Sequence, residues 1–96
     1  MNLFADIRTV VLDALQTLTA EGTLPPGLDF ANVAVEPPRD PLHGDMATNA
    51  AMVLAKPAGM KPRDIADALV AKLAADLRIA GAEVEGLGFL ILRMVP

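Results

Sequence analysis

The spacing of apolar residues predicts an amphipathic helix at the start of the chain. From Leu3 to Leu18 apolar residues recur at steps of three and four, which places on one helical stripe Leu3, Phe4, Ile7, Val11, Ala14, Leu15 and Leu18. Asp6 lies near the start, where the helix dipole favours an anion, and Gly22 lies where a left-handed C-terminal cap is expected. Pro25, Pro26 and Gly27 then prevent continuation of the helix.

Two more helices are predicted in the middle of the chain. The first has apolar residues at helical spacing, namely Met46, Ala50, Val53 and Leu54, and Asp45 stands where an N-cap would accept hydrogen bonds from free amides. The segment Pro57-Ala58-Gly59 ends it. The second starts at Pro62, which suits a first helical turn, and its predicted buried stripe is Ile65, Ala66, Leu69, Val70 and Leu73.

Strands are predicted on either side of these two helices. Residues 31–36 alternate Val33 and Val35 with smaller or polar residues, which is typical of a short half-buried strand. A strand is also expected from Ala82 onward, then a turn or bulge at residues 86–88, then a strand from Phe89 to Val95. This order predicts an α+β fold in which a small, mainly antiparallel sheet has three helices packed on one face, as a single domain over residues 1–96.

Composition narrows the class of protein. The chain has no cysteine, which excludes disulfides and thiolate metal sites, and its start lacks the charged and apolar regions of a signal peptide. No uncharged apolar run reaches the roughly 18 residues typical of a membrane span. The sequence therefore predicts a cytoplasmic protein without a membrane partner.

The charge distribution qualifies what the net charge implies. A net charge of −4 argues against nucleic-acid binding, because contact with phosphates usually needs a basic surface. Residues 39–63, however, contain two carboxylates and four cations, which are Arg39, Lys56, Lys61 and Arg63. This segment thus carries +2 and the other residues −6, so a local basic patch on an acidic domain is expected.

The segment DPLHGDMATNAAMVLAK, residues 40–56, contains the only histidine, His43. It has no second histidine or cysteine for zinc and no Ser-His-Asp arrangement, so we predict neither a catalytic residue nor a metal ligand here. We interpret the segment as a structural corner. His43 would form hydrogen bonds, Gly44 would supply an unusual backbone angle, Asp45 would cap the helix, and Asn49 belongs to the same corner.

Two other patterns have ordinary structural explanations. Asp64 and Asp67 lie one helical turn apart and could resemble paired carboxylates, but a solvated helix face explains them better. The Gly86-Leu87-Gly88 segment lacks the third glycine and the following helix of a dinucleotide site, which favours a strand irregularity. Phe89 stays open: its ring either stacks on an unpaired base or belongs to the core.

Two stretches together resemble a known family. EPPRDPLHGDMATNAAMVLAKPAGMKPRDIADAL and EVEGLGFLILR are similar to the N-terminal additional domain of bacterial arginyl-tRNA synthetases, over nearly the whole chain. The most specific parts are residues 43–56 and the Gly-x-Gly-Phe sequence at residues 86–89. The resemblance implies a domain that precedes the catalytic one and contacts the D-loop of tRNA.

The same resemblance assigns residues to RNA contact. Phe89 matches the aromatic residue of the family's Gly-Pro-Gly-Phe-x-Asn motif and would pack on a D-loop nucleotide. Leu87 replaces the usual proline and Ile91 the usual amide residue, and Ile91 has no polar side-chain group for a base. The complete set expected at the RNA comprises Phe89, Gly86, Gly88, Ile91, Arg93, Arg39, Lys56, Lys61 and Arg63.

The ligase motifs of the family are absent from this sequence. Neither a HIGH-type nor a KMSKS-type motif occurs, so the chain is expected to need no cofactor and to be inactive alone, with ATP used by a parent enzyme. Expected partners are tRNA, bound weakly, and the remaining domains of that parent. The alternative is a structural or protein-interaction module without RNA binding of its own, because acidic helices and a two-sided apolar last strand could pack against other domains.

Overall fold

The first helix forms as its apolar stripe predicts. In the computed structural model, which describes residues 3–37, 44–86 and 88–94, α1 spans Leu3–Ala20. The helix buries Ile7, Val11 and Leu15 completely. It ends where Gly22 adopts a φ of +84°, and the amides of Thr23 and Leu24 donate to the free carbonyl of Leu18.

The next two helices pack on each other, and α3 also packs on α1. Helix α2 spans Ala50–Ala58, with Pro57 in its last turn, and it stops at Gly59, which adopts a φ of +67°. Helix α3 spans Pro62–Leu73 and begins with the proline, as predicted. Its buried residues are Ile65, Ala66, Leu69 and Leu73, and Asp64 and Asp67 are exposed on its other face.

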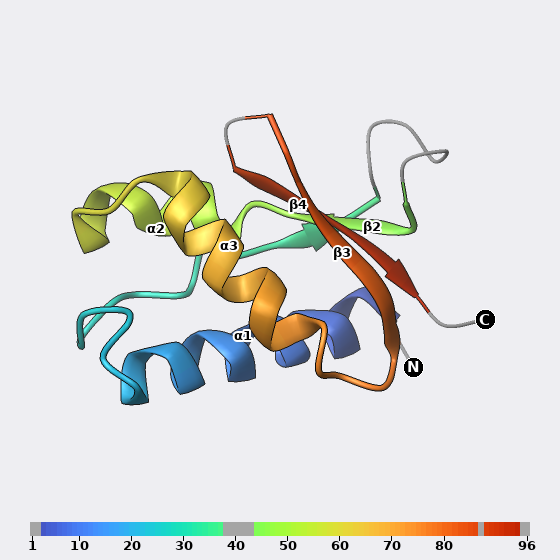
Figure 1. Ribbon diagram of the computed structural model, residues 1–96, viewed down its shortest axis with the longest axis horizontal. Helices are drawn as coiled ribbons and strands as arrows, with labels where there is room; N and C mark the ends of the chain where they lie inside the picture. Colours follow the sequence, from blue (N-terminus) through green and yellow to red (C-terminus); the bar gives the residue numbers. More distant parts are fainter. Residues whose placement is uncertain (1–2, 38–43, 87, 95–96) are drawn as a thin grey trace.

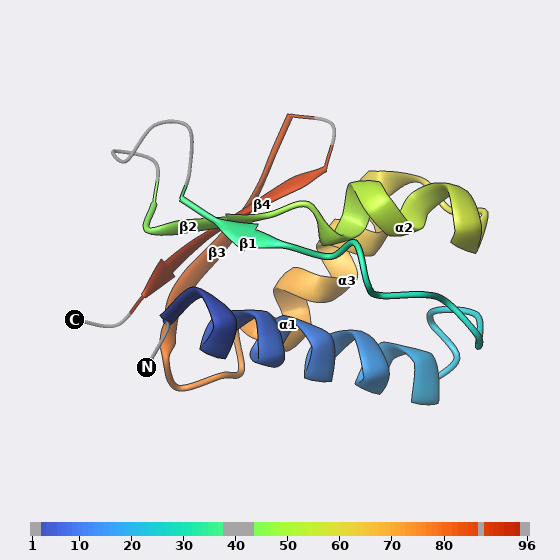
Figure 2. The same cartoon turned by 180° about the vertical axis from the view of Figure 1, so that it is seen from behind.

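The sheet has four antiparallel strands in the order β1-β2-β4-β3. These strands are β1 (Val35–Glu36), β2 (Met46–Thr48), β3 (Ile79–Glu85) and β4 (Phe89–Met94). The helices cover one face of the sheet, as Figures 1 and 2 show from opposite sides. Met46, Leu90 and Leu92 join the helices in one aliphatic core. The predicted α+β class and antiparallel sheet are confirmed.

The prediction that a helix starts at Asp45 and Met46 was wrong. Met46, Ala47 and Thr48 form strand β2 and pair with Leu92, Ile91 and Leu90 of β4, respectively. Helix α2 starts only at Ala50. The sequence misled because a three-residue strand is too short to show its own period, so Met46 fitted the helical spacing that follows. The first predicted strand is also shorter than expected, since only its last two residues pair.

Candidate nucleic-acid interface

Phe89 begins β4 on the face of the sheet that the helices leave uncovered. Successive strand residues point to opposite faces, and the next residue, Leu90, is completely buried in the core. The side chain of Phe89 keeps 38% of its surface exposed. Phe89 is therefore neither a core residue nor a fully solvated one, and part of its ring is available to a partner.

Gly86 and Gly88, which lie between β3 and β4, are held against the start of α3. Gly88 is buried with a φ of +142°, and a β-carbon there would lie 2.7 Å from Cβ of Pro62. Arg63 Nη1 donates to the carbonyl oxygen of Gly86 at 3.3 Å. Figures 1 and 2 both place the start of β4 beside the helix pair α2 and α3. The backbone that presents Phe89 is thus fixed by close contact and a hydrogen bond.

Met52 is a neighbour that the sequence did not single out. A β-carbon at Gly88 would lie 3.5 Å from Cγ of Met52, and the methionine side chain is 37% exposed. Met52 and Phe89 are two of the three large apolar side chains exposed among the described residues. The exposure of Met52 could have been expected from the sequence, because this residue falls between Ala50 and Val53, which belong to the apolar stripe of the helix.

Three of the predicted cations lie at the α2–α3 corner. Lys56 is in the last turn of α2, and Lys61 and Arg63 flank the proline that starts α3. All three are exposed. Since Arg63 reaches Gly86 and Pro62 touches Gly88, this corner adjoins the backbone before Phe89. Arg63 therefore brings a positive charge to the backbone three residues before Phe89.

The other predicted contact residues are placed differently. Arg93 shares the face of Phe89 but lies four residues along β4, about 13 Å away at the usual rise of a strand. Its Nη1 is 3.6 Å from Oε1 of Glu83, so it forms an ion pair within the sheet. Arg39 lies outside the described residues. Glu85 stands directly opposite Phe89 on β3 and adds negative charge at the ring.

The side chain of Ile91 is buried by packing and is not exposed to a binding partner. It lies on the same face as Phe89, yet only 7% of its surface is exposed. A β-carbon on Gly44 would approach Cγ2 of Ile91 within 2.5 Å and the carbonyl oxygen of Leu92 at 3.0 Å. The backbone at Gly44 thus lies directly against Ile91. The isoleucine side chain consequently offers little surface to an RNA base.

The Gly44–Asn49 segment makes structural contacts, although not all of the predicted ones. Asp45 caps no helix; its Oδ2 accepts from the amide of Met94 at 2.7 Å. The helix that it was predicted to cap starts five residues later, with Asn49 at its N-cap position and no side-chain cap bond. The φ of Gly44 is not positive. The close approach of its backbone to Ile91, and not an unusual backbone angle, therefore explains why this residue is a glycine.

Asn49 ties the same segment to the chain before β1. Its Oδ1 accepts from the amide of Ala34 at 2.8 Å, and its Nδ2 donates to the carbonyl of Asn32 at 3.4 Å. The buried hydroxyl of Thr48 donates to the carbonyl of Ala34 at 2.8 Å. These bonds hold β1 beside β2. His43 lies outside the residues that the structure describes.

Residues 3–37, 44–86 and 88–94 contain neither a candidate metal site nor a membrane-spanning helix. This part of the chain contains no group of three or more histidine, cysteine or acidic side chains that could hold a metal ion. None of its helices is long and apolar enough to cross a membrane.

The chain is similar to known proteins over almost its whole length. Residues 5–94 match the sequence family described as "Arginyl tRNA synthetase N terminal domain". The chain belongs to this family. It is 76% identical over 94 residues to the arginine–tRNA ligase of Ruegeria sp. (strain TM1040) and 73% identical over 95 residues to that of Paracoccus denitrificans. The matches cover 98% and 99% of this chain but only 16% of each relative.

Solved structures share the fold at low sequence identity. The arginyl-tRNA synthetase of Plasmodium falciparum superimposes with a TM-score of 0.78 at 13% identity, over 97% of this chain and 16% of that one. The Thermus thermophilus enzyme gives a TM-score of 0.70 at 22% identity, over 98% and 14%. The domain architecture is therefore retained where most side chains differ.

Proposed function

We propose that this chain is the tRNA-binding accessory domain of an arginine–tRNA ligase and contacts the D-loop of tRNA. The observation that carries the proposal is Phe89, a partly exposed aromatic residue at the start of β4, where Arg63 reaches the carbonyl oxygen of Gly86. Stacking of an unpaired base on an aromatic ring contributes about 1–3 kcal/mol and tolerates any base.

The cations and the ring would have separate tasks. Lys56, Lys61 and Arg63 would contact phosphates and position the RNA backbone, whereas Phe89 would contact a base. Glu85 opposes this binding, and so does the net charge of −4, so the chain alone should bind with micromolar or weaker affinity. Within a longer ligase, attachment to the other tRNA-binding parts would raise the effective concentration and make this weak contact useful.

The ligase chemistry would belong to other parts of that enzyme. Such an enzyme would join arginine to its tRNA with ATP in the cytoplasm, and the 96-residue chain would take no cofactor itself. The purified chain should accordingly give no arginine-dependent pyrophosphate exchange above background. Detectable pyrophosphate exchange would contradict the assignment of the ligase chemistry to other parts of the enzyme.

A salt titration with a D-arm RNA hairpin tests the proposed function. Fluorescence anisotropy should report an affinity that falls with salt, with a logarithmic slope of about −2 if three phosphates are contacted at roughly −0.7 each. Lys61→Gln should make the slope shallower, while Lys72→Gln, on the far part of α3 and paired with Glu21, should leave it unchanged. The absence of salt-sensitive binding would instead favour a structural module, which the acidic net charge and Glu85 also support.

A further inference from the structure

Leu77 is an apolar side chain held out into solvent on an ordered turn. Its exposure is 93%, far above that of Met52 or Phe89. The turn between α3 and β3 is fixed around it, because Asp76 Oδ1 accepts from the amide of Arg78 at 2.8 Å and lies 3.4 Å from the same residue's Nε. The amide hydrogen bond, and then the guanidinium, hold the pKa of Asp76 below its usual range.

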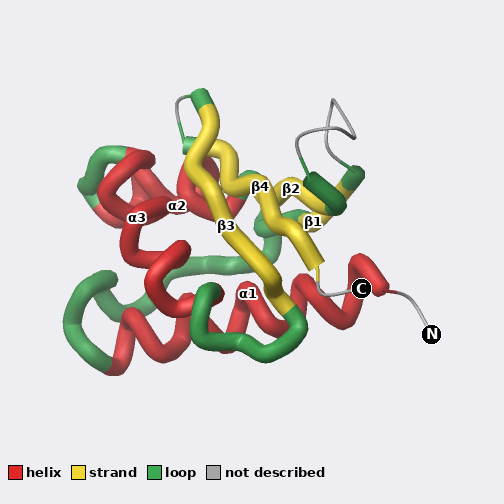
Figure 3. The backbone as a smooth tube through the Cα atoms, turned by 45° about the vertical axis from the view of Figure 1, so that its right-hand side comes forward, coloured by secondary structure: helices red, strands yellow, loops and turns green. Residues whose placement is uncertain are grey.

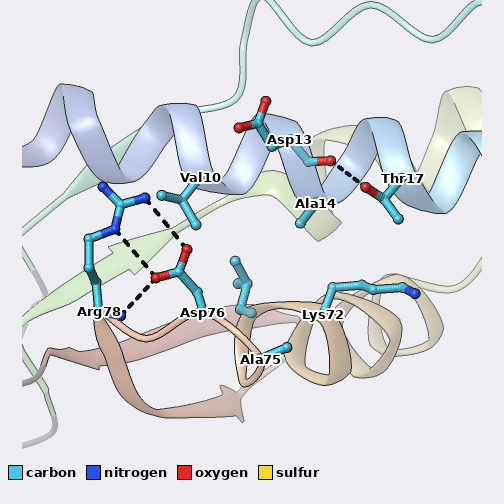
Figure 4. Close-up of a pocket in the computed structure, with 9 residues that line it drawn as sticks. Val10, Asp13, Ala14, Thr17, Lys72, Ala75, Asp76 and Arg78 are labelled. Atoms are coloured by element: carbon cyan, nitrogen blue, oxygen red, sulfur yellow. Dashed lines mark hydrogen bonds and ion pairs between the residues drawn. The ribbon is translucent and has the colours of Figure 1, made fainter.

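A hollow of about 270 Å³ lies beside this turn, between α1 and α3. Figure 4 shows its lining, in which Val10 and Ala14 of α1 face α3 and the Asp76–Arg78 pair forms one end. Leu73 adds apolar surface, while Asp13 and Lys72 contribute charges of both signs. Asp76 and Arg78 line the hollow and flank Leu77 in the sequence, and we name the exposed leucine and the hollow together the Leu77 surface.

The Leu77 surface lies at the end of the sheet toward which β4 runs. Met94, the last residue of β4, pairs with Ile79, two residues after Leu77. Figures 1 and 3 show the α3–β3 connection and the end of β4 at the same end of the sheet. The Ruegeria relative is matched over only 16% of its length, and the shared domain is described as N-terminal. In such a relative, the chain that follows this domain would leave the sheet near Leu77.

We infer that the Leu77 surface docks the part of a longer arginine–tRNA ligase that follows this domain. The inference rests on the proposed function, since it requires the domain to work within such a ligase. An apolar side chain on a rigid turn loses little conformational freedom on contact, which suits it as an anchor. The hollow beside it would receive an apolar side chain of the following part, and its mixed charges would form a polar rim.

Thiol labelling tests the docking, because the chain has no cysteine of its own. Leu77→Cys and Met52→Cys are made in two settings: the 96-residue chain, and a chimera in which this chain replaces the matching residues of the Ruegeria enzyme. The labelling rate at each position is followed by peptide mass spectrometry. In the chimera, the thiol at position 77 should react at least about tenfold more slowly than in the chain, since reactivity follows exposure. The thiol at position 52 should react equally in both.

The outcomes separate docking from RNA binding. An unchanged rate at position 77, in a chimera that charges tRNA, would overturn the docking inference. Protection at position 77 that rises with concentration in the 96-residue chain would also overturn it, by identifying a second copy as the partner. RNA binding by the Leu77→Cys chain should equal that of the unaltered chain. If the unaltered chain did not bind RNA, the proposed function would be contradicted, but the labelling result would still hold.

Discussion

Phe89 and Ile91 are two residues apart on the same face of β4, yet they meet different surroundings. Phe89 keeps 38% of its surface exposed, whereas Ile91 keeps 7%. The backbone of Gly44 lies against Ile91. Phe89, in contrast, follows Gly88 in the sequence and pairs with Glu85 on the neighbouring strand β3. Strand alternation therefore determines the direction of a side chain but not its exposure, which depends on what a distant segment places over it.

This difference gives the departure at position 91 a physical explanation. The family resemblance leads one to expect an amide there, and a buried amide needs hydrogen-bond partners. Ile91 needs none, because its side chain packs under the Gly44 backbone. On the proposed function, this chain would thus keep the stacking contact at Phe89 and lack side-chain recognition of a base at position 91.

The largest effect is expected from Ile91→Asn. The change removes buried apolar surface and buries an amide, so the free energy of unfolding should fall by about 2–4 kcal/mol in urea denaturation. Phe89→Asn is the matched change at the exposed position and should cost less. If Ile91→Asn preserved stability and gained discrimination among D-loop bases, the packed assignment of Ile91 would be wrong.

A smaller loss is expected from Gly88→Ala. The residue has a φ of +142°, and the added carbon would meet Cβ of Pro62 at 2.7 Å, so stability should fall by about 1–3 kcal/mol. Gly86→Ala is the control without a steric contact, because Gly86 also has a positive φ, +62°, but nothing lies within 4 Å of an added carbon. Equal losses for both variants would show that contact with Pro62 does not position the turn before Phe89.

Asp45→Ala tests what holds the backbone over Ile91. The carboxylate accepts from the amide of Met94, so its removal should lower stability by about 0.5–1.5 kcal/mol. Hydrogen exchange at the Met94 amide should accelerate, while exchange at the first amides of α2 should not change. Asp67→Ala, on an exposed helix face, is the control. Faster exchange confined to α2 would restore the cap assignment for Asp45.

Much of the fold could be predicted from the sequence because long periodic segments determine their own structure. Helices α1 and α3 each have enough turns for the apolar stripe to be recognised, and Gly22 and Pro62 mark an end and a start correctly. Strand β2 could not be predicted, because its three residues are defined by pairing with β4, more than 40 residues later.

The candidate site was predictable only in part, for the same reason. Phe89 and Arg63 could be named from the sequence, but the approach of Arg63 to the backbone before Phe89 depends on Gly88 lying against Pro62. Met52 escaped notice because helical spacing alone does not show which off-stripe residue lies beside a distant turn. The roles of Gly44 and Asp45 likewise depend on β4, which no local pattern reveals.

The smallest effect is expected from Glu85→Gln. This carboxylate lies opposite Phe89 and would repel RNA phosphates, so its removal should strengthen hairpin binding by less than about 1 kcal/mol, and less at high salt. Glu36→Gln, on the far edge strand β1, should change binding less. Equal gains for both would indicate that net charge alone, and not charge near Phe89, governs binding.

The central claim is that Phe89 serves binding more than folding, and one variant tests it most directly. For Phe89→Ala, anisotropy with the D-arm hairpin should show affinity weakened by about 1–3 kcal/mol. The loss of unfolding free energy should stay below the about 3–5 kcal/mol that removal of a core phenylalanine costs. Unchanged RNA affinity in a folded Phe89→Ala protein would contradict the claim and leave the structural-module reading in its place.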